Sequence, residues 1–509
     1  MNVRHRAFSC AIHAIVSVGV LLSSPYMFHA VEAKAGDPER PNDVSANQSA
    51  VDIQPWKALQ EGVSWSGDGG IAANEPRLGT LKDLNGYFPF DPPDSAAEWE
   101  VRREQVKRRI LVATGLWPMP PREPVEADIY GCVDRDGYTV ERVCFESYPG
   151  FYVTGSLFRP KGYEGPRPGI LCPHGHWTNA RFYDAGEKSL VQSLFEGAER
   201  FDPSGRFPIQ ARCVQLARMG CIVFLYDMIG YSDSLQLPHR PGYREQMNTM
   251  SRWGYFSPQA ELRMQNMMGL QTFNSIRALD WLIALPEIDK NRIGVTGASG
   301  GGTQTMILTA IDDRVTAAFP ACMVSTAMQG GCTCENASYL RVDTGNIEFA
   351  AMAAPRPLGM TAADDWTVEI ETKGLPELKQ LYALLGVKDR VEVWPLLHFG
   401  HNYNYVSRGR MYNFFNRCFH LGFAEPVVAD DFVPLQHEDL TLWDGDHPKP
   451  PHGEEFERDL LESITSISDA QMRALMPSGR ESLEEFRKTV GCAVDVMVGR
   501  RMPDVVDVV

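Results

Sequence analysis

The chain has 509 residues, of which 44% are hydrophobic and 22% are charged, a composition ordinary for a globular enzyme with a large core. Its net charge of −16 argues against nucleic acids and anionic membrane surfaces as partners, because both require a basic face. A neutral substrate, such as an ester, is compatible with this charge, while the oligomeric state stays open.

The first 35 residues are typical of a secretory signal peptide. Arg4 and Arg6 precede an apolar run over residues 11–22, and small-residue cleavage sites end at Ala33 and Ala35. The apolar run is shorter than the ~20 residues that a membrane span requires. We therefore expect a secreted or periplasmic protein without membrane association after cleavage. Residues 36–126 are predicted to form an N-terminal extension, partly disordered, with one helix over 95–115.

The middle of the chain has the pattern of an α/β fold. Hydrophobic residues alternate with polar ones between 127 and 160, which predicts antiparallel strands at 138–147 and 151–158. Short apolar strands then alternate with helices as far as residue 423, which predicts a mostly parallel twisted sheet with helices on both faces. The predicted strands are 169–172, 221–226, 293–296, 315–319, 357–361 and 391–396, and the predicted helices are 209–219, 259–284, 304–311, 376–385 and 408–419.

Two insertions, the bounds of the catalytic domain and a C-terminal extension complete this organisation. Residues 232–258 and 323–351 are long irregular insertions, which are usually lids or binding loops. Residues 127–423 are predicted to be the catalytic domain. Residues 424–509 are predicted to be a linker followed by a helical extension, with helices at 454–467 and 480–490.

The segment Gly297-Ala-Ser-Gly-Gly301 matches the Gly-x-Ser-x-Gly nucleophile elbow and lies between a predicted strand and a predicted helix. A side chain at either flanking glycine would collide with the neighbouring strand or helix. One alternative is an ordinary glycine-rich turn with a solvated serine. A phosphate-binding loop would need a lysine before the Ser or Thr, which is missing here. We predict that Ser299 is a nucleophile.

A serine nucleophile needs a base and a third group that orients the base, in the chain order Ser, Asp or Glu, His. Asp364 and Asp365 follow the strand predicted at 357–361, and His398 and His401 follow the strand predicted at 391–396. We favour Asp365 and His401. Asp364 and His398 stay open as alternatives. The two aspartates could also form a turn and helix cap, and the two histidines a buried pair, without any catalytic role.

An oxyanion intermediate needs two backbone donors, one directly after the nucleophile and one after an earlier strand. The amide of Gly300 is the first candidate. The second is the amide of His176, with Trp177 as the alternative, in the loop after the strand predicted at 169–172.

Metal binding is not predicted. A zinc ion at His174 and His176 is disfavoured because two ligands lack a third nearby in the sequence. Cys332 and Cys334, in a polar loop, are placed for disulfide or metal chemistry, but no CxxC…CxxC pattern exists. We therefore expect neither a structural zinc ion nor any cofactor. Disulfide pairing is left open.

Taken together, these motifs resemble the α/β-hydrolase superfamily, and most closely its branch of acetylxylan esterases, cephalosporin-C deacetylases and dienelactone-hydrolase-like proteins. The resemblance covers roughly residues 138–422. It implies that the Asp before Trp in Asp-Trp-Thr is the acid and that the His of His-Asn-Tyr-Asn is the base, which supports Asp365 and His401. The motifs that carry it lie at residues 173–175, 226–232, 297–301, 365–367 and 401–404.

The resemblance implies a serine hydrolase of carboxylic esters that acts on a small-molecule or polysaccharide ester of the acetylxylan type, and the signal-peptide pattern implies that the enzyme is secreted. A glucuronoyl-type esterase is one alternative. A prolyl-oligopeptidase-like peptidase is another, although the roughly 90 mature residues before the first strands are too few for a β-propeller. An inactive binding protein is disfavoured because all three positions of the triad are filled. The long N- and C-terminal segments depart from the compact deacetylases.

Overall fold

The computed structural model describes residues 83–499. The predicted signal peptide and the extension up to residue 82 lie outside the described residues. Residues 84–499 belong to one compact unit. None of the described helices is both long enough and apolar enough to cross a membrane.

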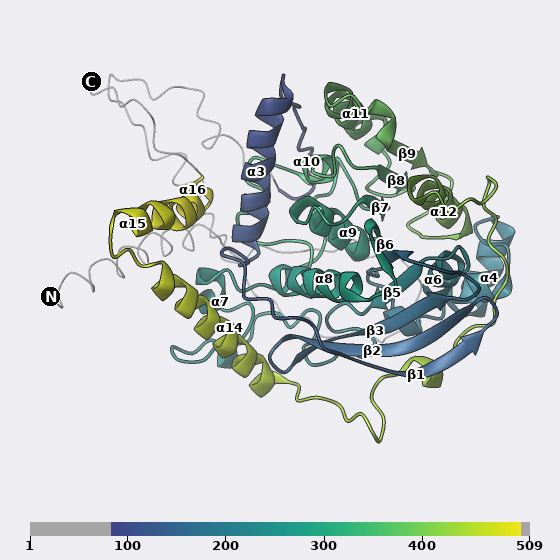
Figure 1. The fold of residues 1–509 in the computed structure, drawn as a ribbon, viewed down its shortest axis with the longest axis horizontal. Helices are drawn as coiled ribbons and strands as arrows, with labels where there is room; N and C mark the ends of the chain where they lie inside the picture. The colour runs from purple at the N-terminus through teal and green to yellow at the C-terminus, as the bar shows by residue number, and fades with distance from the viewer. Residues whose placement is uncertain (1–82, 500–509) are drawn as a thin grey trace, which may run out of the picture. The chain divides into compact units, whose positions relative to one another are not determined.

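One mixed sheet organises this unit (Figure 1), and its strand order is β1-β2-β3-β5-β4-β6-β7-β8-β9. The first three strands pair antiparallel with their neighbours, and β3 also pairs antiparallel with β5, whereas every pair from β5 to β9 is parallel. The strands are Ala127–Arg135 (β1), Tyr138–Tyr148 (β2), Phe151–Pro160 (β3), Arg167–Leu171 (β4), Ile222–Tyr226 (β5), Ile288–Ala298 (β6), Ala317–Ala321 (β7), Leu358–Ala362 (β8) and Val391–Pro395 (β9).

Helices cover both faces of the sheet because the parallel strands are apolar on both faces. Successive residues of β4 enter different cores: Leu171 belongs to the core that includes residues of α3, α8 and α9, whereas Ile170 belongs to the core that includes residues of α6 and α12. The helices are Ala96–Ala113 (α3), Gly186–Phe195 (α4), Asp202–Arg206 (α5), Pro208–Arg218 (α6), Pro258–Leu262 (α7), Met267–Ala284 (α8), Gly300–Ile311 (α9), Asn346–Ala351 (α10), Leu375–Leu384 (α11), Tyr405–Phe419 (α12), His437–Leu440 (α13), Glu454–Leu475 (α14), Arg480–Phe486 (α15) and Cys492–Val498 (α16).

The mostly parallel α/β sheet with antiparallel N-terminal strands is confirmed, but the single helix predicted over 259–284 is wrong. The chain breaks between α7 and α8, where Met264 adopts a positive φ of 56°. Asn266 then caps α8 by accepting a hydrogen bond from the amide of Gly269 at 2.8 Å. An asparagine cap competes with a continuous helix, and this explains the break.

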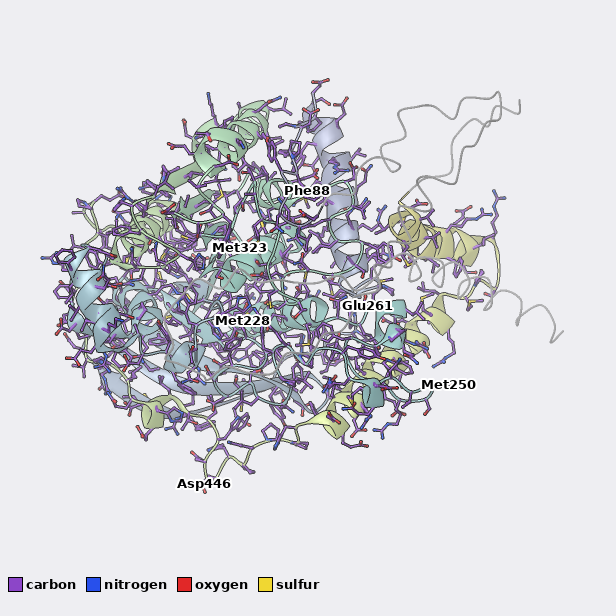
Figure 2. All side chains as sticks on the ribbon, turned by 180° about the vertical axis from the view of Figure 1, so that it is seen from behind. Phe88, Met228, Met250, Glu261, Met323 and Asp446 are labelled. Carbon is purple, nitrogen blue, oxygen red and sulfur yellow. The ribbon has the colours of Figure 1, made fainter. Side chains whose placement is uncertain are left out.

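Residues after α12 pack back onto the unit. The amide of Leu435 donates to Gln210 Oε1 of α6 at 2.9 Å, and the amide of Tyr255 donates to Glu457 Oε1 of α14 at 2.8 Å. Figure 2 shows the side chains of Met228 and Met323 in the interior and those of Met250 and Asp446 at the outer edge. Met228 and Met323 follow β5 and β7, so the ends of these strands are buried.

Candidate active site

Ser299 occupies the tight turn between β6 and α9. Its backbone has φ 56° and ψ −128°, a strained conformation for a residue other than glycine, and its side chain makes no capping hydrogen bond to α9. A Cβ added at Gly297 would lie 2.5 Å from the carbonyl oxygen of Pro173, and one added at Gly301 would lie 2.4 Å from the same atom. Both glycines are therefore required by the close approach of the loop after β4.

Asp365 and His401 lie together at the ends of β8 and β9. The Nδ1 atom of His401 is 2.7 Å from Asp365 Oδ2, while Asp365 Oδ1 accepts hydrogen bonds from the amide and the hydroxyl of Thr367 at 2.7 and 2.5 Å. The Asp365 side chain is 5% exposed. The neighbouring Asp364 and His398 side chains are exposed, and neither makes this contact.

The loop after β4 lies directly against the elbow. A Cβ at Gly175 would be 2.8 Å from Ser299 Cβ, and a Cβ at Gly300 would be 2.8 Å from Cε1 of His176. The backbone that carries the predicted second oxyanion donor therefore borders Ser299. The amide of Gly300 is in the first turn of α9, where amides lack intrahelical acceptors and the helix dipole favours negative charge.

The buried side chain of His174 holds this loop in place through hydrogen bonds to the backbone. Its ring is fully buried, and burial lowers its pKa to about 3, so the ring is neutral. Nε2 accepts a hydrogen bond from the amide of Met228 at 2.9 Å, and Nδ1 donates to the carbonyl oxygen of Gly175 at 2.9 Å. With both nitrogens bound to the backbone, His174 is not a metal ligand.

Two aromatic rings and a small cavity lie beside the predicted base, and a larger cleft lies beside His176. The ring of Trp177 stacks on His401 with a centroid distance of 6.0 Å, and that of Trp366 lies at 4.5 Å. A cavity of about 150 Å³ is lined by Trp177 and His401. A larger cleft of about 1010 Å³ is lined by His176, Phe182, Tyr231, Trp443 and several polar residues. A further cavity of about 640 Å³ lies beside α3 and contains none of the predicted site residues.

Sequence reasoning missed one group of side chains. The structure brings His176 together with His239, Cys332 and Cys334, although they come from three separate loops. The sequence singles out His176, Cys332 and Cys334, but it gives His176 the neighbouring His174 as its apparent partner and offers no third ligand nearby. His239 lies in the long insertion after β5, and nothing in its local sequence indicates its neighbours. None of the ten cysteines of the described residues forms a disulfide.

Comparisons with known proteins extend this description. A profile of the Abhydrolase family matches residues 77–326. The Bacillus subtilis (strain 168) protein named "Putative hydrolase YtaP" is 24% identical over 223 residues, which cover 43% of this chain and 64% of that protein, less than two thirds of its length. Among solved structures, Methylesterase BT1017 has a TM-score of 0.53 at 24% identity, with 78% of each chain covered. A glucuronoyl esterase from Solibacter usitatus has a TM-score of 0.43 at 15% identity, with 69% of this chain and all of that chain covered.

Proposed function

We propose that this chain, which has an α/β-hydrolase fold, cleaves carboxylic esters with Ser299 as nucleophile, His401 as base and Asp365 as the group that orients the base. The observation that carries the proposal is the 2.7 Å contact between His401 Nδ1 and Asp365 Oδ2 at the same edge of the sheet as the strained turn of Ser299. Parallel α/β sheets place their sites at this edge, beyond the carboxyl ends of the strands.

In the proposed mechanism, Ser299 Oγ attacks the ester carbonyl carbon while His401 Nε2 accepts the hydroxyl proton. Asp365 accepts a hydrogen bond from the Nδ1–H group of His401 and so stabilises the imidazolium, without itself taking the proton. The amides of Gly300 and His176 bind the oxyanion. The tetrahedral intermediate expels the alcohol, which takes the proton from His401. Water then attacks the acyl-enzyme by the same route, releasing the acid and restoring Ser299.

The substrate that we propose is an ester of a carbohydrate, of the acetylxylan type. The cleft that His176 borders supports this, because Phe182, Tyr231 and Trp443 offer flat apolar faces to sugar rings, and Arg206 and Lys449 are among its polar lining residues. We further propose that the protein is exported, on the basis of the signal-like pattern in residues 1–35.

A hydrolysis panel tests the substrate class. The full chain is assayed on acetylated xylan, longer-chain acyl esters, the methyl ester of glucuronic acid and a proline-containing peptide. We expect the highest kcat/KM on the acetylated carbohydrate. Preference for the methyl glucuronate would favour the glucuronoyl-type alternative, and cleavage of the peptide alone would contradict ester hydrolysis.

The role of Asp365 can be separated from that of its neighbour. We expect Asp365→Asn to lower kcat by about 10⁴-fold, because an amide would favour the wrong tautomer of His401. Asp364→Asn is the matched control, since the Asp364 side chain is exposed, and its kcat should stay within about threefold of the wild type. Steady-state kinetics on one soluble acetyl ester measures both variants. Equal losses of kcat in the two variants would contradict the proposed role of Asp365.

A further inference from the structure

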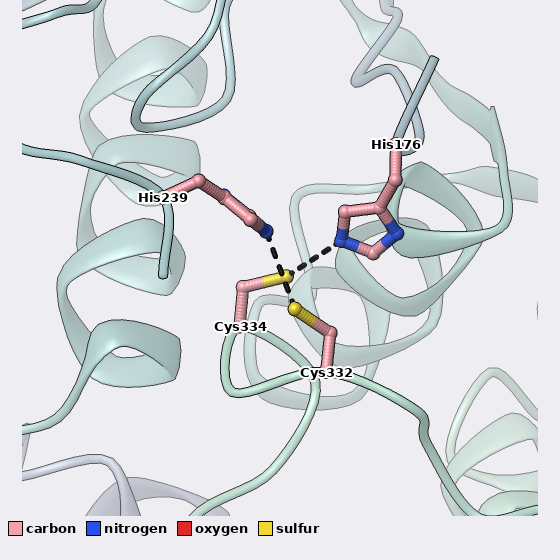
Figure 3. Close-up of side chains that lie close together, drawn as sticks. All are labelled: His176, His239, Cys332 and Cys334. Atoms are coloured by element: carbon pink, nitrogen blue, oxygen red, sulfur yellow. Dashed lines mark hydrogen bonds between the residues drawn. The ribbon is translucent and has the colours of Figure 1, made fainter. Parts of the chain in front are cut away.

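Four side chains with metal-binding atoms meet beside the nucleophile turn (Figure 3). They come from the loops after β4, β5 and β7, and their ligand atoms all lie within 4.8 Å of one another. The Nε2 atom of His176 is 3.2 Å from Cys334 Sγ, and that of His239 is 3.3 Å from Cys332 Sγ. The two cysteines are only 2–3% exposed. The cluster thus joins three loops that are distant in sequence.

The orientation of His239 shows which nitrogen is available. Its Nδ1 atom lies 2.8 Å from the carbonyl oxygen of Ile229. Because a carbonyl oxygen only accepts hydrogen bonds, Nδ1 carries a proton, and loss of a proton from the ring leaves a lone pair on Nε2 directed toward the sulfur atom of Cys332. A backbone carbonyl on the far nitrogen is the usual way in which a protein orients a histidine that binds a metal.

The sulfur of Cys332 has a partner suited to a thiolate. Arg240 Nε donates a hydrogen bond to Cys332 Sγ at 3.2 Å. A positively charged donor stabilises a deprotonated sulfur, which is the form that binds metals. A lone pair on His239 Nε2 and a thiolate at Cys332 would repel each other unless a proton or a metal ion lay between them.

Two N···S separations in the cluster are close to those around a tetrahedral ion. Zn–N bonds of about 2.0–2.1 Å and Zn–S bonds of about 2.3 Å at tetrahedral angles separate neighbouring ligand atoms by roughly 3.3–3.8 Å. The two measured N···S distances, 3.2 and 3.3 Å, are close to this range. Two thiolates with two imidazoles form a ligand set that zinc prefers, and four protein ligands leave no open position for substrate.

We propose that His176, His239, Cys332 and Cys334 bind one zinc ion, which fastens the loops after β4, β5 and β7 around Ser299. The ion is structural, because its coordination is complete without water or substrate. Its effect on catalysis, which rests on the proposed function, is indirect: the ring of His176 packs on Gly300, so fixing this ring also fixes the backbone amide of His176. His239, Cys332 and Cys334 are therefore positioning residues.

Metal analysis of the full chain, purified without chelator, tests the site. We expect one zinc ion per chain in the wild type and in Ser299→Ala, and a loss of most of the zinc in His239→Ala and Cys332→Ser. The matched controls are His452→Ala and Cys132→Ser, whose side chains are exposed outside the cluster, and both should keep the ion. Cobalt exchanged into the wild type should give the thiolate charge-transfer and visible bands of a tetrahedral site, which requires no variant to fold.

Several outcomes would overturn the proposal. A wild-type chain without metal, in which mass spectrometry finds a disulfide between Cys332 and Cys334, would replace the zinc site by a redox pair. Zinc retained in both His239→Ala and Cys332→Ser would place the ion elsewhere. Metal content is independent of ester hydrolysis, so a zinc-loaded chain without esterase activity would contradict the proposed function and leave the zinc site standing. We expect kcat/KM of His239→Ala to fall by about 10–100-fold.

Discussion

Replacing Ser299 with alanine is expected to lower kcat/KM for a short p-nitrophenyl ester by about 10⁴-fold or more, because no other group forms the acyl-enzyme. The thermal unfolding midpoint should change little. The hydroxyl of Ser299 makes no capping hydrogen bond to α9, and alanine keeps the same Cβ in the same strained turn. Initial rates and a thermal melt of the same preparation measure both effects.

The matched control is Ser466→Ala, on the exposed face of α14, which should keep wild-type kinetics. If Ser299→Ala turned over the ester within tenfold of the wild-type rate, the proposed nucleophile would be wrong. A Ser299→Ala chain that is inactive and also unfolded would not support the assignment, and a circular dichroism spectrum of the native fold is therefore part of the result.

The second large effect concerns stability. Arg181 is fully buried and donates to both carboxylate oxygens of Asp227 at 3.0 Å, to Asp233 Oδ2 at 2.6 Å and to the carbonyl oxygen of Leu440 at 2.7 Å. Removing one member of a buried ionic network leaves uncompensated charge in a region of low dielectric constant. We expect Arg181→Met to lower the free energy of unfolding by about 3–5 kcal/mol, measured by urea unfolding.

Arg480→Ala is the control for this variant. The Arg480 side chain is 93% exposed, and its ion pair with Glu484 is solvated, so its removal should change the free energy of unfolding by less than about 0.5 kcal/mol. Similar losses in the two variants would show that the buried network has no special role. The network joins the loops after β4 and β5 to the segment after α12, so Arg181→Met should also loosen that segment in hydrogen exchange.

The fold was largely predictable because its central parallel strands β4, β5, β7 and β8 are short apolar runs whose residues are almost all buried. Residues 221–226 and 391–396 were placed within a residue or two of β5 and β9. The break between α7 and α8 was not predicted, because the apolar period continues across it and only the cap at Asn266 interrupts the helix. Helix α4 was also missed: its one buried residue, Leu190, gives little periodicity.

Local sequence motifs predicted only part of the candidate site. Ser299, Asp365 and His401 each follow a predicted strand, so their order along the chain indicated a common edge of the sheet. The choice between Asp364 and Asp365 depended on side-chain direction, which adjacent residues in a loop do not reveal. The partners of His176 depended on how two long insertions fold over the sheet, and such tertiary contacts have no periodic signal.

Covalent labelling tests the central claim most directly. The full chain is treated with a fluorophosphonate, digested with trypsin and analysed by mass spectrometry. Ser299 is the only serine in the tryptic peptide 293–314. We predict one adduct per chain on this peptide at Ser299, and protection by an acetyl ester substrate. Labelling of another residue, or an unlabelled wild-type chain that still hydrolyses the ester, would contradict the account.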